Sequence, residues 1–207
     1  MTQDDGIQPT VFIVDDDPAV RDALSWLIGT LRYNVEVFES AQAFLDACQP
    51  DRPGCLVLDV RLPGMSGLQL QKRLAEQGIE LPVIIITGHG DVPMAVSAIQ
   101  AGALNFLEKP FRDQEVLDSV QQAIMVDAEN RARRQRSTEI MDCIEALTPR
   151  EYEVMKLMVK GDSNKKIAAT CGISIKTVEV HRARVMEKMR AGSLPELVRM
   201  VLAVEPE

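Results

Sequence analysis

The sequence predicts a doubly wound α/β domain with a five-stranded parallel sheet, followed by a linker helix and a small all-α domain. Up to residue 126, short apolar runs alternate with longer stretches whose apolar residues recur every three or four positions. Beyond residue 147 only the longer, helical pattern remains, and glycines separate its segments. A chain of 207 residues that is 46% hydrophobic and 26% charged has room for two globular domains of ordinary composition.

Five apolar, mostly β-branched runs are the expected strands of the first domain. Three of them are apolar at every position, which is typical of parallel strands that helices cover on both faces. The expected strands span 11–14, 35–38, 55–58, 83–86 and 105–107. Helix-period stretches lie between and after them, over 18–31, 40–48, 67–77, 92–101 and 113–126.

The segment 127–145 is expected to be a solvated helical linker, because it contains four arginines and neither proline nor glycine. After it, we expect helices over 150–159, 164–170, 175–189 and 195–204, each preceded by a Ser or Thr start signal. The predicted organisation is therefore a first domain over 1–126, a linker over 127–145 and a second domain over 146–207.

Charge is distributed unevenly between these parts. Residues 1–126 carry 18 acidic and 8 basic side chains, whereas residues 148–207 carry 8 and 11, within a chain whose net charge is −8. A mildly basic second domain is compatible with nucleic acid. No apolar run is long enough to cross a bilayer, no signal peptide is visible, and the four cysteines are widely spaced, so we expect a cytoplasmic protein with reduced thiols.

Acidic residues follow two of the predicted strands where those strands end. Asp15 and Asp16 come after the first strand and Asp59 ends the third, so all three should converge at the carboxyl edge of the sheet. Carboxylates that converge need a cation, and an all-oxygen donor set favours Mg²⁺. An alternative for the acidic run is that it only caps the next helix, since Asp17 and Pro18 form a good helix start.

The next two strands end in Thr87 and Lys109, which adds a hydroxyl and an ammonium to the same edge. Either residue alone would more often be an ordinary strand-end or solvated side chain. In combination with the three acids, they predict a site for a phosphoryl group in transit.

Four motifs resemble those of response-regulator receiver domains: Val14 to Asp17, Leu58 to Gly67, Ile86 to Gly90 and Phe106 to Phe111. The resemblance covers residues 9–126, implies a flavodoxin/CheY-like fold, and is nearest to the FixJ branch. It implies that Asp59 is the phosphoacceptor and that Asp15, Asp16, Asp59 and the carbonyl of Arg61 bind Mg²⁺, Asp15 through water. It further implies that Thr87 and Lys109 bind phosphoryl oxygens, that Phe106 turns inward on activation, and that the Lys109–Pro110 peptide is cis. His89 and Met94 are interpreted as scaffold.

The C-terminal segment 146–204 resembles the LuxR/NarL-type helix-turn-helix, through Thr148 to Met155, Gly161 to Ala168 and Ile173 to His181. Its second central helix is the expected recognition helix. On that helix Val178, His181, Val185 and Met189 form the predicted buried stripe. The predicted DNA-contacting residues are Lys165, Lys176, Thr177, Glu179, Val180, Arg182, Arg184 and Lys188.

Two further features of this domain concern Glu179, for which alternatives stay open, and the apolar residues of the last helix. Glu179 could accept a hydrogen bond from a cytosine amine, or pair on the helix surface with Arg182 or Lys176. In the last helix, Leu197, Val198 and Val201 exceed what a small core needs and are expected to serve dimerisation.

We therefore expect a DNA-binding transcriptional regulator, an activator and not an enzyme. Its expected partners are a sensor histidine kinase, promoter DNA and, once phosphorylated, a second copy of the chain, with RNA polymerase as a further candidate and no membrane. A phosphatase of similar carboxylate and Mg²⁺ design is the alternative, but it would need an acid where Arg61 stands. A second alternative is an interaction protein that no longer accepts phosphate, against which the complete set of pocket residues argues.

Overall fold

The computed structural model describes residues 8–88 and 92–204, and residues 8–130 contain the predicted parallel sheet. The strands are paired in the order β2-β1-β3-β4-β5, and every pair is parallel. Their bounds are Thr10–Val14 (β1), Asn34–Phe38 (β2), Gly54–Asp59 (β3), Val83–Thr87 (β4) and Asn105–Glu108 (β5). The predicted five-stranded parallel fold is thus confirmed.

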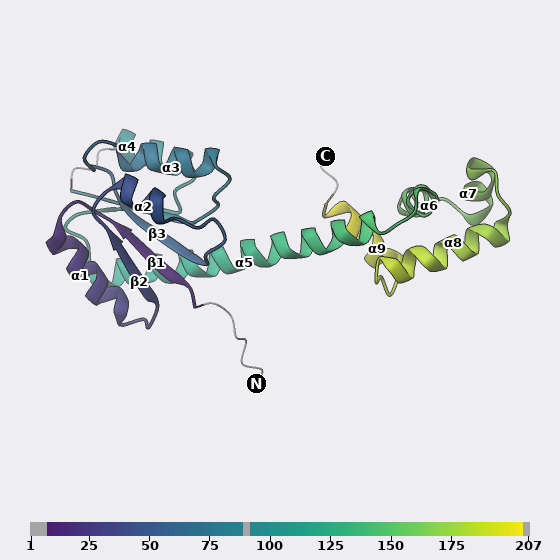
Figure 1. Ribbon diagram of the computed structural model, residues 1–207, viewed down its shortest axis with the longest axis horizontal. Helices are drawn as coiled ribbons and strands as arrows, with labels where there is room; N and C mark the ends of the chain where they lie inside the picture. Colours follow the sequence, from purple (N-terminus) through teal and green to yellow (C-terminus); the bar gives the residue numbers. More distant parts are fainter. Residues whose placement is uncertain (1–7, 89–91, 205–207) are drawn as a thin grey trace. The chain divides into compact units, whose positions relative to one another are not determined.

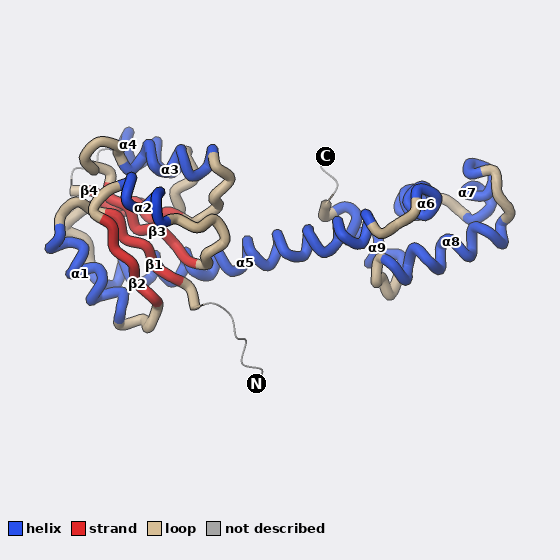
Figure 2. The backbone as a smooth tube through the Cα atoms, viewed as in Figure 1, coloured by secondary structure: helices blue, strands red, loops and turns tan. Residues whose placement is uncertain are grey.

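Helices cover both faces of this sheet (Figures 1 and 2). Helices α2, α3 and α4 pack on one face, while α1 and the first part of α5 pack on the other. The bounds are Pro18–Gly29 (α1), Ala41–Ala47 (α2), Gly67–Glu76 (α3), Val92–Gln100 (α4) and Asp113–Glu145 (α5). The doubly wound arrangement follows from the all-apolar strands, because both of their faces have to be buried.

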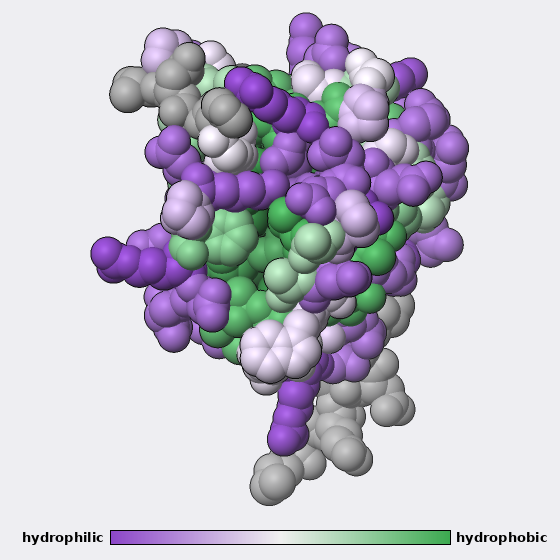
Figure 3. All heavy atoms as spheres, turned by 90° about the vertical axis from the view of Figure 1, so that its left-hand side faces the viewer, coloured by the Kyte–Doolittle hydropathy of each residue, from purple (hydrophilic) through white to green (hydrophobic). Residues whose placement is uncertain are grey.

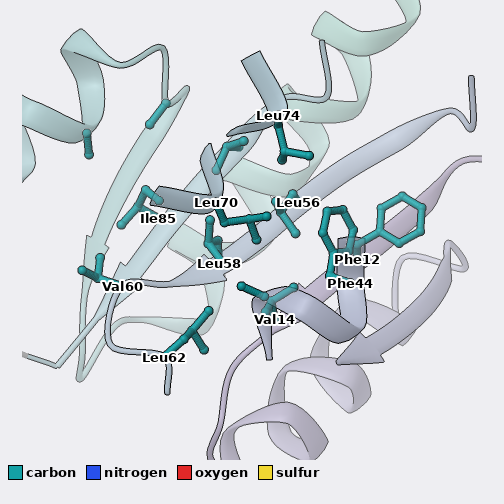
Figure 4. Close-up of a cluster of buried hydrophobic side chains, with 14 residues drawn as sticks. Phe12, Val14, Phe44, Leu56, Leu58, Val60, Leu62, Leu70, Leu74 and Ile85 are labelled. Carbon is teal, nitrogen blue, oxygen red and sulfur yellow. The ribbon is translucent and has the colours of Figure 1, made fainter. Parts of the chain in front are cut away.

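Alternate residues of β1, β3 and β4 enter separate cores on the two faces. In β1, Phe12 and Val14 enter the core beneath α2 and α3, where they meet Phe44, Leu56 and Leu70 (Figure 4). Their neighbours on β1 enter the core beneath α1 and α5 instead. This two-residue period fixes which residues of neighbouring strands lie side by side. It therefore also fixes which residues end the strands at the carboxyl edge of the sheet.

Helix α5 extends through the segment expected to be a helical linker, so residues 127–145 are helical as predicted. The chain divides into two compact units between Asn130 and Arg131. The second unit also contains α6 (Pro149–Val159), α7 (Asn164–Cys171), α8 (Ile175–Lys188) and α9 (Leu194–Leu202). Hydroxyl side chains start α6 to α9 as the sequence predicted, at Thr148, Ser163, Ser174 and Ser193.

The second unit has its own apolar core, and this core corrects one prediction. Leu197 and Val201 of α9 are 0% and 1% exposed and pack among the side chains of α6 and α8. These two residues are therefore part of the core and are not available for dimerisation, whereas Val198 is half-buried and its role in dimerisation stays a prediction. The prediction assumed that four short helices need fewer apolar residues than they do.

Within the described residues, no helix has the length and apolar character needed to span a membrane. All four cysteines are free thiols.

Candidate functional site

An acidic pocket lies at the carboxyl edge of the sheet, where β1 and β3 end. Asp15 follows β1 and Asp59 ends β3, and the two residues are only 2% and 6% exposed. The ammonium of Lys109, just beyond β5, bridges them: Nζ lies 2.6 Å from Asp15 Oδ2 and 2.9 Å from Asp59 Oδ1. One lysine thus holds two buried carboxylates from neighbouring strands.

The three aspartates that follow β1, Asp15 to Asp17, have different surroundings and contacts. Asp17 caps α1, because its side chain accepts a hydrogen bond from the Ala19 N–H at 2.9 Å. The backbone N–H of Asp17 donates to Asp15 Oδ1, also at 2.9 Å, and so orients the buried carboxylate. Asp16 is exposed at the rim. Asp17 therefore caps the helix, whereas Asp15 lies in the pocket, so the two interpretations of the acidic run apply to different residues.

Three further contacts position the two buried acids. Arg21 of α1 donates from Nη1 to the backbone carbonyl of Asp15 at 2.7 Å. The backbone N–H of Arg61 donates to Asp59 Oδ2. A Cβ at Gly67 would lie 2.2 Å from the Asp59 carbonyl oxygen, so only glycine lets α3 begin this close to the end of β3. The positions of Arg21 and Gly67 beside these acids were not predictable from the sequence, because neither contact leaves a signal in residue spacing.

The remaining predicted residues of the pocket lie on β4 and β5. Thr87 is fully buried at the end of β4, and its carbonyl accepts a hydrogen bond from the Lys109 N–H at 2.8 Å. The Lys109–Pro110 peptide is cis, as the resemblance implied. Phe106 is half-buried against the core beneath α4. Residues 89–91, including His89, lie outside the described residues.

The pocket is short of positive charge. Burial raises the pKa of Asp15 above its usual range, and the hydrogen bond from Lys109 compensates for only part of that effect. Burial would by itself lower the pKa of Lys109, but its hydrogen bonds to Asp15 and Asp59 outweigh burial and raise that pKa. The pocket therefore attracts a further cation.

The donor chemistry of the pocket fits a hard divalent ion. Its side-chain donors are carboxylates, and such oxygens select Mg²⁺ or a similar cation over softer metals. Across residues 8–88 and 92–204 no three potential ligands already converge on one point, and Lys109 lies between the two buried acids. Binding an ion would thus require Lys109 to share these carboxylates.

An apolar groove runs beside the pocket, between α1 and the segment that follows β5. Lys109 and Phe111 line one wall, and Leu24 and Leu27 line the other. Trp26 at its margin is 76% exposed. Figure 3 looks at this end of the molecule and shows hydrophobic side chains gathered among hydrophilic ones.

In the second unit, α8 presents the faces that its sequence predicted. Val178, Val185 and Met189 are buried, and His181 is half-buried. Glu179 and Val180 are exposed, the latter by 47%. The other residues of the predicted DNA-contacting set are exposed at Lys165, Lys176 and Arg184 and half-buried at Thr177 and Arg182. Thr177 also shares a 2.8 Å hydrogen bond with the Ser174 hydroxyl at the start of the helix.

Lys188 is the exception, because its ammonium is engaged inside the domain. Its Nζ donates to Glu151 Oε2 at 2.7 Å and to the Ala146 carbonyl at 3.0 Å. The structure therefore does not support Lys188 as a phosphate contact. The sequence predicted Lys188 as a DNA contact from its basic side chain on α8, but it could not show that this long side chain reaches Glu151 of α6.

Comparison with known proteins agrees with both units. Residues 11–121 match the response regulator receiver domain, and residues 145–201 match the luxR family of bacterial regulatory proteins. The chain is 47% identical to nodulation protein W of Bradyrhizobium diazoefficiens over 190 residues, which is 92% of this chain and 84% of that protein. It is 48% identical to the transcriptional regulatory protein FixJ of Azorhizobium caulinodans over 192 residues, covering 93% and 91%.

Among solved structures, the response regulator StyR matches with a TM-score of 0.84 at 44% identity, covering 94% of this chain and 98% of that one. In this chain the receiver match precedes the luxR-family match. The chain therefore belongs to the two-component response regulators, transcriptional regulators that join a phosphorylatable receiver domain to a luxR-type DNA-binding domain.

Proposed function

We propose that Asp59 accepts a phosphoryl group from a histidine of a sensor kinase, and that this modification controls DNA binding through α8. The observation that carries the proposal is the bridge of Lys109 between two buried carboxylates at the edge of the sheet. In this scheme residues 1–126 act as the receiver, 127–145 as the connecting helix and 146–207 as the DNA-binding domain.

The transfer is a displacement at phosphorus. An oxygen of the Asp59 carboxylate attacks the phosphorus and a P–O bond forms. The P–N bond to the donor imidazole breaks, its electron pair stays on that nitrogen, and the ring leaves as neutral imidazole with the proton that its other nitrogen already carries. The Asp59 carboxylate is oriented by hydrogen bonds from Lys109 and from the Arg61 N–H. The donor reaches Asp59 from the open edge of the sheet, where the groove beside Lys109 offers apolar surface to the protein that carries it.

Asp15, Asp16, Asp59 and the backbone carbonyl of Arg61 would hold Mg²⁺. When bound, the ion offsets the negative charge that builds up between these carboxylates and the phosphoryl oxygens. Asp15 is held in place by Asp17 and Arg21.

The same residues provide the switch. A phosphoryl group adds nearly two negative charges, and these draw Lys109 away from Asp15 and draw the Thr87 hydroxyl inward. Lys109 lies just beyond β5 and Thr87 ends β4, so their displacement reshapes the space around the half-buried Phe106. The neighbouring surface of α4 carries Val96 and Ile99, which are 47% and 48% exposed and suit association with a second copy.

In the DNA-binding domain, the exposed residues of α8 would enter the major groove. Glu179 and Val180, which are exposed, would meet base edges, and the surrounding lysines and arginines would meet phosphates. We propose the remaining members of the predicted set as contacts, namely Lys165, Lys176, Thr177, Arg182 and Arg184. The functional setting is a cytoplasmic activator that acts at promoters, with RNA polymerase as a further partner.

Labelling by acetyl phosphate in the presence of Mg²⁺ tests the phosphoacceptor. Wild-type protein should become labelled, and Asp59→Asn should not. Asp17→Asn is the matched control, because Asp17 lies in the same acidic run but caps a helix. Full labelling of Asp59→Asn, or loss of labelling in Asp17→Asn while the protein stays folded, would contradict the assignment.

A further inference from the structure

One lysine ties the last turn of α8 to the end of α5 and the start of α6. Its Nζ donates to the carbonyl of Ala146, directly after α5, and to Oε2 of Glu151 in α6. The same Glu151 oxygen accepts from the Thr148 N–H at 2.9 Å. We call these four residues, Ala146, Thr148, Glu151 and Lys188, the lysine node.

The charges in the node are balanced. The side chain of Glu151 is 3% exposed and that of Lys188 is 34% exposed. The hydrogen bond from Lys188, followed by that from the Thr148 N–H, lowers the pKa of Glu151 to about 2. Glu151 is therefore ionised at neutral pH, and its buried charge is matched by one cation and one backbone donor.

The node also completes the end of α5. The last carbonyls of a helix have no partner within the helix, and a cation near them is favourable. Helix α5 has no basic residue in its own last turn. Lys188, far away in the sequence, supplies that cation and links the end of α5 to the end of α8.

Apolar packing alone would fix the orientation of α8 less firmly than packing together with the hydrogen bonds of the lysine node. Val178, Val185 and Met189 bury its inner face, but hydrophobic contacts have little directional preference. Hydrogen bonds are directional, so the node resists both rotation of α8 and sliding along its axis. Successive helix residues are about 100° apart around the axis, so even a partial rotation would move Glu179 and Val180 off the bases that they face.

We propose that Lys188 is a positioning residue for the recognition helix and does not contact DNA phosphate, with Glu151 as its obligatory partner. The proposal rests on the DNA-binding function proposed above and assigns this part of α8 to orientation. Lys176, at the exposed start of the same helix, keeps the phosphate role.

The positioning role of Lys188 is tested by measuring how full-length protein binds two DNA duplexes at several salt concentrations. One duplex carries a sequence recovered by binding-site selection, and the other carries a scrambled sequence. The main variant is the double substitution Glu151→Gln, Lys188→Met. A buried ion pair that is removed as a pair leaves no unmatched charge, so the fold should be kept, and the glutamine can still accept from the Thr148 N–H. Lys188→Arg and Lys176→Met are the matched controls, and circular dichroism gives Tm for each.

The double variant should melt close to wild type yet bind the selected duplex about tenfold more weakly, with binding to the scrambled duplex unchanged. Its salt dependence should equal that of wild type, because no phosphate contact is lost. Lys188→Arg keeps the cation and should bind the selected duplex as tightly as wild type. Lys176→Met should instead reduce the slope of log affinity against log salt by about 0.9 and weaken both duplexes alike.

Two results would overturn the positioning role. One is a salt slope in the double variant that falls as it does in Lys176→Met, since Lys188 would then contact phosphate. The other is unchanged preference for the selected duplex, since the node would then be structural only. A wild-type chain from which no sequence can be selected would overturn the DNA-binding proposal itself, and the positioning role with it.

Discussion

The acidic pocket at the sheet edge and the lysine node each contain a lysine that contacts buried carboxylates. The two sites differ in how fully positive charge matches negative charge. Lys109 is shared between Asp15 and Asp59, whereas Lys188 serves Glu151 and a backbone carbonyl. Burial raises the pKa of Asp15 and the shared Lys109 offsets only part of that effect, whereas the hydrogen bond from Lys188 lowers the pKa of Glu151. A site that is short of positive charge is ready to take a cation or to exchange its partners, whereas a balanced site holds the fold together.

The largest effect that we expect comes from Lys109→Met. It removes the only cation that the structure places between Asp15 and Asp59 among its described residues, and with it a donor to the transferred phosphoryl group. Labelling by acetyl phosphate should fall by about 10²–10³-fold, as for loss of one donor to a developing charge. Lys72→Met, which removes an exposed lysine on α3, is the control and should label normally. Labelling within a few-fold of wild type in Lys109→Met would mean that the shared lysine is not part of the transfer site.

A second prediction concerns pH, and its sign differs between the two regions. A carboxyl whose pKa is raised by folding, such as Asp15, gains stability as pH falls through that pKa. A carboxyl whose pKa is lowered, such as Glu151, contributes stability above its ordinary value near 4.5 and loses it as pH falls toward about 2.

Amide hydrogen exchange in EDTA, read separately for residues 10–126 and 147–202, measures both contributions. Protection attributable to Asp15 should rise between neutral pH and pH about 4, and Asp15→Asn should remove that rise. Protection attributable to Glu151 should fall below pH about 4, and Glu151→Gln should remove that fall. Slopes of the same sign in the two regions would contradict the difference in charge balance.

The smallest effect tests what α8 does once it is positioned. Glu179→Ala should relax discrimination at one base pair per half-site by about 1–3 kcal/mol, while non-specific affinity rises slightly because a negative charge is lost. Glu187→Ala removes the same charge from another exposed position of α8 and should leave discrimination unchanged. Binding-site selection distinguishes the two outcomes. An identical preferred sequence for wild type and Glu179→Ala would favour surface pairing of Glu179 with Arg182 or Lys176.

The fold and the grouping of side chains in the acidic pocket could be predicted from the sequence. Both follow from the period of the apolar residues and from the order of the strands along the chain. All-apolar strands require helices on both faces, and strands that end at one edge bring Asp15, Asp59, Thr87 and Lys109 together. Contacts made by long side chains between distant segments were not predictable in this way. A helical wheel gives the direction of a Cβ, but it does not tell where a lysine ammonium ends, and so the partner of Lys188 was missed.

The predicted dimerisation role of Leu197 and Val201 in α9 was wrong for a related reason. How much apolar surface a small core needs depends on how closely its helices pack, and spacing in the sequence does not report this distance. Leu197 and Val201 fill space between α6 and α8 and are not left over for dimerisation. Arg21 and Gly67 were missed because their contacts are with the backbone of the acidic strands.

DNA affinity measured with and without acetyl phosphate, for wild type and Asp59→Asn at one salt concentration, tests the central claim most directly. Wild type with Mg²⁺ and phosphoryl donor should bind a selected duplex more tightly than wild type without donor, and Asp59→Asn should respond to neither. Equal tightening of both proteins, or no tightening of a wild type that is demonstrably labelled at Asp59, would contradict control of α8 by the receiver pocket.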